Sequence, residues 1–223
     1  MKPFRERLHN EVIVFDGGVG TYLYEKGVYI NTCFDELNLT NADLVAEIHK
    51  DYIQAGADVI ETNTFGANRI KLAPHGLETR VYDINKKGAE IARKVAGDST
   101  YVAGSIGPLG VQIEPIGKLS FDEVREIFKE QITGLLDGGV DLIVLETFSL
   151  VSELVQAVKA VRELNATIPL MAQMTVNDDG VLLSGAPLES FIRETADAAI
   201  DIVGLKVQLR DSARRGRSAR MPS

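Results

Sequence analysis

The chain has 223 residues, which is enough for one large domain but short of the about 250 that a complete eight-stranded α/β barrel takes. A hydrophobic content of 45% with 25% charged residues is typical of a soluble globular protein, and no run approaches the ~20 apolar residues of a membrane span. The net charge of -8 argues against nucleic acid as a partner of the folded part.

The charge is unevenly distributed along the chain. Residues 206–223 carry six basic side chains against one acidic one, a net of +5, which leaves -13 for residues 1–205. We therefore predict a folded domain over 1–205 and a basic tail over 206–223 that is disordered and has no specific partner. The N-terminus lacks an apolar stretch of signal-peptide length, and Cys33 is the single cysteine, so a reducing, cytoplasmic location is expected.

Strand and helix patterns alternate along the chain, which indicates βα units around a parallel sheet. Short apolar runs predict six strands, over residues 12–15, 59–62, 101–105, 141–146, 170–174 and 202–205. Helical periodicity predicts helices over about 42–55, 81–95, 120–136, 151–164 and 188–199. Asn41 is a predicted helix cap, and Ser120 with Glu123 has the spacing of a capping box. The sequence thus predicts an α/β fold of about six βα units.

Carboxylates stand at the ends of three of these strands. Asp16 follows the first apolar run, and Glu61 and Glu146 each close a buried run and precede Thr and, soon after, Phe. A charged residue at the last position of a buried strand must emerge where solvent or a ligand can meet it. We therefore predict that the three carboxylates share one rim of a barrel-like sheet. Asp16 before two glycines could instead be only a turn former, and Glu146 could pair with a neighbouring Lys or Arg.

The histidines predict no metal site. His9 lies near the terminus, His75 lies in a loop, and His49 is expected on the exposed side of its helix. No spacing brings two of them onto one ion, so each is interpreted as solvated or structural.

Four motifs, in this order and spacing, give the chain a family resemblance over residues 1–205. They are Asp16-Gly-Gly-Val-Gly-Thr21, Glu61-Thr-Asn-Thr-Phe-Gly-Ala-Asn68, Gly104-Ser-Ile-Gly-Pro-Leu-Gly110 and Glu146-Thr-Phe148. The chain resembles the homocysteine S-methyltransferase family, and in particular the N-terminal half of proteins that combine this activity with methylenetetrahydrofolate reductase.

The resemblance implies a (βα)8 barrel of the TIM type, here incomplete, and zinc-dependent transfer of a methyl group to the homocysteine thiol to give methionine. A cation lowers the proton affinity of a thiol and so makes the nucleophile available at neutral pH. By resemblance, Asp16 and Glu146 face the substrate ammonium and chain, and the backbone of Gly17 and Gly18 approaches its carboxylate. By the same resemblance, Thr64 is expected to line this pocket, which Glu61, Asn63 and Thr147 could extend. The methyl donor, of the methyl-folate or S-methylmethionine type, is not identified by these residues.

The chain departs from the family at the expected metal ligands. The family's zinc is held by cysteines, one just after the sixth strand and an adjacent pair at the end of the eighth. Here Lys206 stands where Asn is expected and Val207 stands where the first cysteine should be, while Cys33 matches a position that is not a zinc ligand. We therefore expect a truncated, catalytically inactive chain with open barrel edges that favour self-association.

Two other functions remain open at this point. Asp16, Glu61 and Glu146 could form a carboxylate set for a hard metal such as magnesium in a different barrel enzyme. Alternatively, the chain could be a non-catalytic fragment that a partner chain completes.

Overall fold

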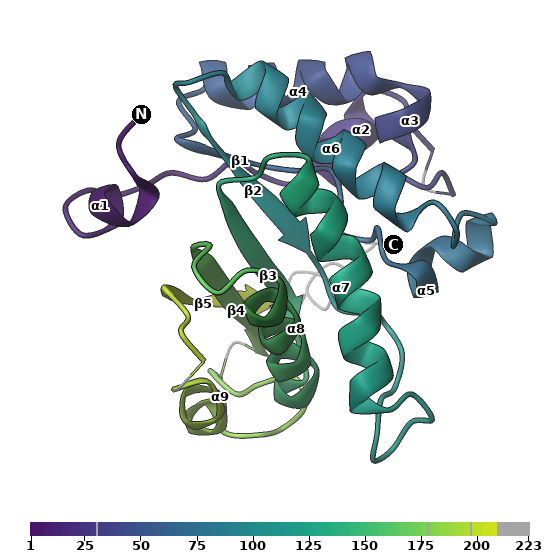
Figure 1. Cartoon of the computed structure of the whole chain (residues 1–223), viewed down its shortest axis with the longest axis vertical. Helices are drawn as coiled ribbons and strands as arrows, with labels where there is room; N and C mark the ends of the chain where they lie inside the picture. Colours follow the sequence, from purple (N-terminus) through teal and green to yellow (C-terminus); the bar gives the residue numbers. More distant parts are fainter. Residues whose placement is uncertain (30, 178, 197, 209–223) are drawn as a thin grey trace, which may run out of the picture.

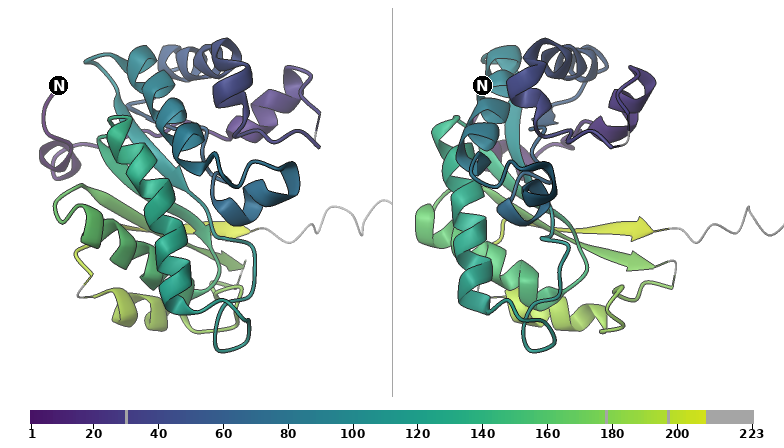
Figure 2. Two further views of the ribbon diagram at one scale, coloured as in Figure 1. Left: turned by 45° about the vertical axis from the view of Figure 1, so that its right-hand side comes forward. Right: turned by 90° about the vertical axis from the view of Figure 1, so that its right-hand side faces the viewer.

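The computed structural model describes residues 1–29, 31–177, 179–196 and 198–208. In these residues five parallel strands form one sheet in chain order: β1 (Val59–Glu61), β2 (Tyr101–Ile106), β3 (Leu142–Phe148), β4 (Leu170–Asn177) and β5 (Ile202–Gln208). The sheet curls, and the longer helices that connect its strands lie on its outer side (Figures 1 and 2). The expected α/β fold, an incomplete barrel of the (βα)8 type, is confirmed.

Helices connect and precede the strands. They are α1 (Phe4–Leu8), α2 (Val19–Glu25), α3 (Leu37–Thr40), α4 (Ala42–Gln54), α5 (Arg69–Leu72) with a 3-10 turn (Ala73–His75), α6 (Val81–Ala96), α7 (Phe121–Asp137), α8 (Val151–Leu164) and α9 (Leu188–Thr195). Asn41 caps α4, and Ser120 and Glu123 form the predicted capping box at the start of α7. Within the described ranges, no helix is both long enough and apolar enough to cross a membrane.

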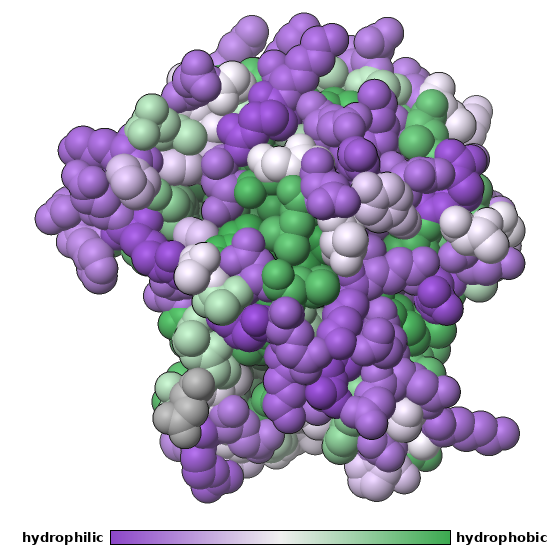
Figure 3. Space-filling view, viewed as in Figure 1, coloured by the Kyte–Doolittle hydropathy of each residue, from purple (hydrophilic) through white to green (hydrophobic). Residues whose placement is uncertain are grey.

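The outer face of the sheet is buried against α7 and α8. Alternate strand residues such as Ile106, Leu145 and Met174 point outward into a core that includes Phe128 of α7 and Leu154 of α8. α6, α7 and α8 stand side by side along the sheet (Figure 2). Their outward sides are hydrophilic over most of the face shown in Figure 3, as expected for amphipathic helices that bury one stripe.

The inner face changes from apolar to polar along each strand. Near the strand starts it is lined by a cluster in which Val59, Tyr101 and Leu142 pack with Phe4 of α1. Because side chains alternate with a period of two, the same face continues to Glu61, Ser105 and Glu146 at the strand ends. The apolar cluster therefore closes the bottom of the half-barrel, and polar groups gather at its carboxyl end.

The prediction of a first strand over residues 12–15 is wrong. Only a single parallel bridge, between Phe15 and Val59, joins this segment to β1. Val14 accepts hydrogen bonds from the backbone of Asp58 and Val59, while the side chains of Val12 and Val14 are 88% and 52% exposed. The apolar run signalled a buried strand, but too few consecutive pairs form, so the described sheet has five strands and not six.

The last strand is longer than the sequence predicts. β5 pairs with β4 from Ile202 through Gln208, whereas the predicted tail begins at Lys206. The start of the predicted tail was set by its basic composition, whereas strand pairing uses backbone groups and does not depend on composition. Residues 209–223 of the predicted tail lie outside the described residues.

His49 corrects a second expectation. It was predicted on the exposed side of α4, but its side chain is fully buried, together with Val45 and Ile48 of the same helix. The helix carries a wider buried face than the apolar stripe indicates, because it packs against both α3 and α6. Neither ring nitrogen has a hydrogen-bond partner among the described residues.

Candidate functional site

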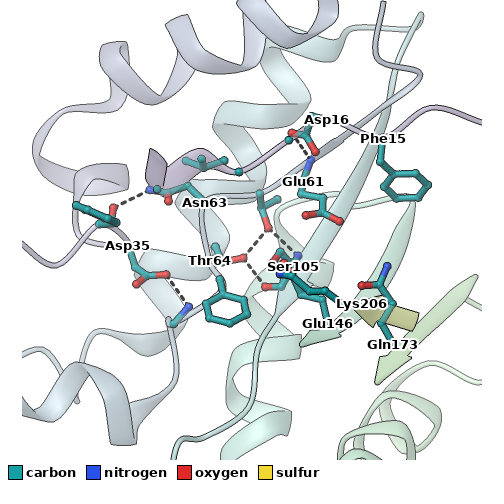
Figure 4. Close-up of a pocket in the computed structure, with 18 of the residues that line it drawn as sticks. Phe15, Asp16, Asp35, Glu61, Asn63, Thr64, Ser105, Glu146, Gln173 and Lys206 are labelled. Atoms are coloured by element: carbon teal, nitrogen blue, oxygen red, sulfur yellow. Dashed lines mark hydrogen bonds and ion pairs between the residues drawn. The ribbon is translucent and has the colours of Figure 1, made fainter. Parts of the chain in front are cut away.

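A cavity of about 920 Å³ opens at the carboxyl end of the strands. It is lined from the segment after residue 12, the loop before α3, and the ends of β1 to β5, so residues far apart in sequence meet there (Figure 4). Asp16, Glu61 and Glu146 all line this cavity. Ligands of α/β barrels bind at this end because the loops and strand ends converge there.

Asp16 is held by the first strand of the sheet. Its backbone N–H donates to the carbonyl of Val59 at 3.0 Å, and its Oδ2 accepts a hydrogen bond from the backbone N–H of Glu61 at 3.0 Å. Its Oδ1 is buried with no hydrogen-bond partner among the described residues. Burial raises the pKa of this carboxyl to about 7, and the nearby Glu146 adds to the increase. Asp16 thus combines a raised pKa with an acceptor atom that has no donor in the described part of the chain.

Glu61, at the end of β1, lies in the same negative environment. Burial raises the pKa of its carboxyl well above the ordinary value, and the charges of Glu146 and Asp16 raise it further, while Lys206 opposes the increase. Carboxylates held this close to one another resist simultaneous ionisation. The three carboxylates of the cavity would therefore be stabilised in their ionised form by an additional positive charge.

Glu146 is the best-connected carboxylate of the cavity. Its Oε1 accepts a hydrogen bond from Ser105 Oγ at 2.7 Å, and its Oε2 accepts one from Thr147 Oγ1 at 3.2 Å. Lys206 Nζ lies 3.7 Å from Oε2, so the predicted alternative of a Lys or Arg partner is also realised. Thr147 does not line the cavity, but it has a φ of 64° at a register irregularity of β3, which turns the strand end at this point.

Thr64 and Asn63 shape the cavity wall through buried hydrogen bonds. Thr64 Oγ1 donates to the carbonyl of Ser105 at 2.8 Å and so accepts from Thr62 Oγ1 at 2.6 Å. Asn63 Nδ2 donates to the carbonyl of Phe34 at 2.7 Å. Both side chains line the cavity. The Thr64 hydroxyl and the Asn63 amide nitrogen already have protein partners, which tie the end of β1 to β2 and to the loop before α3.

Gly17 and Gly18 lie next to Asp16 on the cavity lining. A Cβ at Gly17 would lie 2.9 Å from the hydroxyl of Tyr52 in α4, so a side chain there would require the Tyr52 ring to shift. Gly18 precedes α2, and its carbonyl accepts a long hydrogen bond of 3.5 Å from the same hydroxyl. A Cβ at Gly18 would make only an ordinary contact of 3.7 Å with Thr21 Oγ1, so close packing restricts Gly17 and not Gly18.

A second cluster in the cavity, formed by Asp35, Lys71 and the Phe65 ring, was not predicted from the sequence. Asp35 accepts a hydrogen bond from the backbone of Gly66 at 3.0 Å, and burial raises the pKa of its carboxyl to about 6. Lys71 Nζ lies 4.5 Å from the centre of the Phe65 ring, and burial lowers the pKa of its ammonium. Asp35 belongs to the loop before α3, which has no periodic signal, so only the tertiary structure reveals the group.

The residues present do not fit a zinc site. Among the described residues, no group of three or more His, Cys, Asp or Glu side chains is arranged to hold a metal ion. Val207, at the position expected for the first cysteine, has no donor atom, and Lys206 next to it adds a positive charge. Cys33, the single cysteine of the chain, lines the cavity with no second thiol beside it. The same result counts against a magnesium site built from Asp16, Glu61 and Glu146.

Comparison with known proteins identifies the class. The sequence profile of the homocysteine S-methyltransferase family matches residues 13–211, so the chain belongs to this family of α/β barrel enzymes. It is 33% identical to methionine synthase of Mycobacterium tuberculosis over 214 residues and 32% identical to that of Mycobacterium leprae over 216. These matches cover 89% and 90% of this chain but 18% of each relative, so the chain spans under a fifth of their length.

A solved structure agrees with this assignment. The metallated form of the homocysteine methyltransferase MmuM from Escherichia coli superimposes with a TM-score of 0.80 at 25% identity. The match covers 92% of this chain and 77% of that one.

Proposed function

We propose that this chain binds homocysteine in the cavity at the strand ends, with the substrate ammonium held by Asp16, Glu61 and Glu146. The unpartnered Oδ1 of Asp16 is the observation that carries the proposal, because a buried acceptor without a donor is costly until a ligand supplies one. An ammonium group offers three donors and a positive charge, which suits a cluster of carboxylates whose pKa values are raised.

We also propose that this chain does not transfer methyl groups by the zinc-dependent route of the family. Val207 supplies no thiolate, and the cavity offers no alternative set of metal ligands among the described residues. Without a metal, the thiol of a bound homocysteine lacks the Lewis acid that favours its ionised form in the family. Binding without turnover is the expected behaviour.

Calorimetry of the purified chain tests the binding. Homocysteine should bind, and 4-sulfanylbutanoate, the same molecule without its amino group, should bind at least roughly tenfold more weakly because the carboxylates lose their cation. On the same preparation, zinc content and methionine formation should both be negligible with S-methylmethionine or methyltetrahydrofolate as donor. Equal affinity for the two ligands would contradict the ammonium site, and stoichiometric zinc with turnover would contradict the inactive state.

The exposed apolar residues of β5 support the proposal of self-association. Val203, Leu205 and Val207 alternate along β5 and are 48%, 49% and 55% exposed. An exposed apolar row on a terminal strand is a template for pairing with another chain.

Sedimentation velocity at several concentrations should therefore show association. Val203→Lys should shift the chain toward monomer by roughly tenfold in dissociation constant, because it places a charge in the apolar row. Ile116→Lys, which changes another exposed apolar side chain in the loop between β2 and α7, is the matched control and should leave association unchanged. A wild-type chain that stays monomeric at every concentration would refute self-association.

A further inference from the structure

Lys206 is the one basic residue, in the described part of the chain, that forms an ion pair with a carboxylate of the Asp16, Glu61 and Glu146 cluster. Its Nζ donates a hydrogen bond to Thr147 Oγ1 at 2.9 Å and lies 3.7 Å from Glu146 Oε2. The Lys206 side chain is 53% exposed, whereas that of Glu146 is 16% exposed. The ammonium of an exposed lysine at the cavity rim therefore lies next to the mostly buried carboxylate of Glu146.

The fold builds this contact through two strands. Parallel pairing sets Lys206 beside Thr175 of β4, on the inward-facing side of β5 with Ile202 and Gly204. On β3, the irregularity between Leu145 and Phe148 turns Thr147 so that its hydroxyl donates to Glu146 and accepts from Lys206. Thr147 therefore bridges the cation to the carboxylate and fixes the place of the ammonium.

This place coincides with the one that an amino-acid ligand needs. The Lys206 ammonium and the α-ammonium of a ligand carry the same charge and the same donors, and in the proposed binding mode both are attracted to Glu146. Two cations beside one carboxylate repel each other, so a ligand ammonium on Glu146 either binds more weakly while Lys206 stays there or displaces Lys206. The exposed lysine can move into solvent at low cost, since exposed ion pairs are weak.

We propose that Lys206 is a specificity-determining residue that acts as a built-in competitor for the ammonium subsite on Glu146. The proposal rests on the proposed binding of homocysteine through its ammonium group. Lys206 reduces the affinity for ligands that carry an ammonium and has no such effect on ligands that lack one. The cavity consequently discriminates less between homocysteine and its desamino analogue than its three carboxylates alone would allow.

Calorimetry of Lys206→Gln with homocysteine and with 4-sulfanylbutanoate tests the inference. Homocysteine should bind roughly threefold to tenfold more tightly than to the wild-type chain, as expected when a weak competing ion pair is removed. The desamino analogue should bind equally or more weakly, because Lys206 no longer attracts its carboxylate. The ratio of the two affinities is therefore the readout, and Lys206→Met, which keeps the apolar stem, should change it in the same direction.

Lys26→Gln is the matched control. Lys26 forms an ion pair of 2.7 Å with Glu47 outside the cavity, so its replacement removes the same charge without touching the site. A similar gain in this control would overturn the inference by attributing the effect to net charge. Wild-type binding of homocysteine with no change in the ratio for either Lys206 variant would overturn it while leaving the proposed function intact. Failure of homocysteine to bind to any of the chains would overturn the proposed function, and the inference with it.

Discussion

Asp16→Asn is expected to make the folded chain more stable at neutral pH and to remove most of its affinity for homocysteine. The asparagine Oδ1 can still accept the hydrogen bond that the backbone of Glu61 donates to Asp16. The negative charge, however, disappears from a site where burial and Glu146 disfavour it. Loss of a charged partner in a partly buried site should weaken homocysteine binding roughly 30-fold or more.

The pH dependence gives the stability effect its sign. The pKa of Asp16 is about 7 in the folded chain and the ordinary value for an aspartate is 3.8, so the folded state binds more protons between these values. The contribution of Asp16 to the free energy of unfolding of the wild-type chain therefore decreases as the pH rises from about 4 to about 7. Asp16→Asn should gain about 1–3 kcal/mol in free energy of unfolding at pH 7.5 and little at pH 4, measured by urea denaturation.

Asp58→Asn is the matched control, because the same chemical change there should have the opposite sign. Asp58 accepts a hydrogen bond from the backbone of Val14 and one from Arg7, and these contacts lower the pKa of its carboxyl. Its contribution is present above the ordinary pKa and is lost as the pH falls, so Asp58→Asn should destabilise at neutral pH and leave homocysteine binding unchanged. If Asp16→Asn instead lost stability at pH 7.5, the carboxylate would have a structural role and not one in binding a ligand.

The carboxylate rim could be predicted from sequence because each of its members ends a local pattern. Glu61 and Glu146 each terminate a buried apolar run, and parallel strands bring such ends to one edge of a sheet. Asp16 reached the same rim even though residues 12–15 form only one bridge, since hydrogen bonds to β1 suffice to place it. The local pattern and the strand direction together therefore predicted that these three carboxylates lie at one rim of the sheet.

Other parts depend on contacts that no local pattern encodes. Lys206 was interpreted as the start of a basic tail, but backbone pairing extends β5 and brings its ammonium to Glu146. Asp35 lies in a loop, where neither period two nor period 3.6 applies. The difference between these residues and Glu146 is that their neighbours come from distant segments.

His49 is another such residue, and its burial predicts acid sensitivity. Desolvation lowers the pKa of its imidazole to about 4, against an ordinary value of 6.5. Both ring nitrogens are buried without a partner among the described residues, so protonation would place an unpaired charge inside the α3, α4 and α6 layer. The unfolded chain takes up this proton below about pH 6.5, and the folded chain does so only near pH 4.

His49→Leu should therefore become progressively more stable than the wild-type chain as the pH falls from 6.5 to 4. The gain from this linkage reaches about 3 kcal/mol at pH 4, and removal of two unpartnered polar atoms adds about 1 kcal/mol at every pH. Asp16 and Asp35 shift stability in the opposite direction, but they are present in both chains and cancel when the two are compared at each pH. His9→Leu, at an exposed position outside this helix layer, is the control for replacing a histidine with leucine. A constant difference for His49→Leu would mean that the imidazole has a proton acceptor or solvent access in the folded chain, and burial of α4 as described here would then be incorrect.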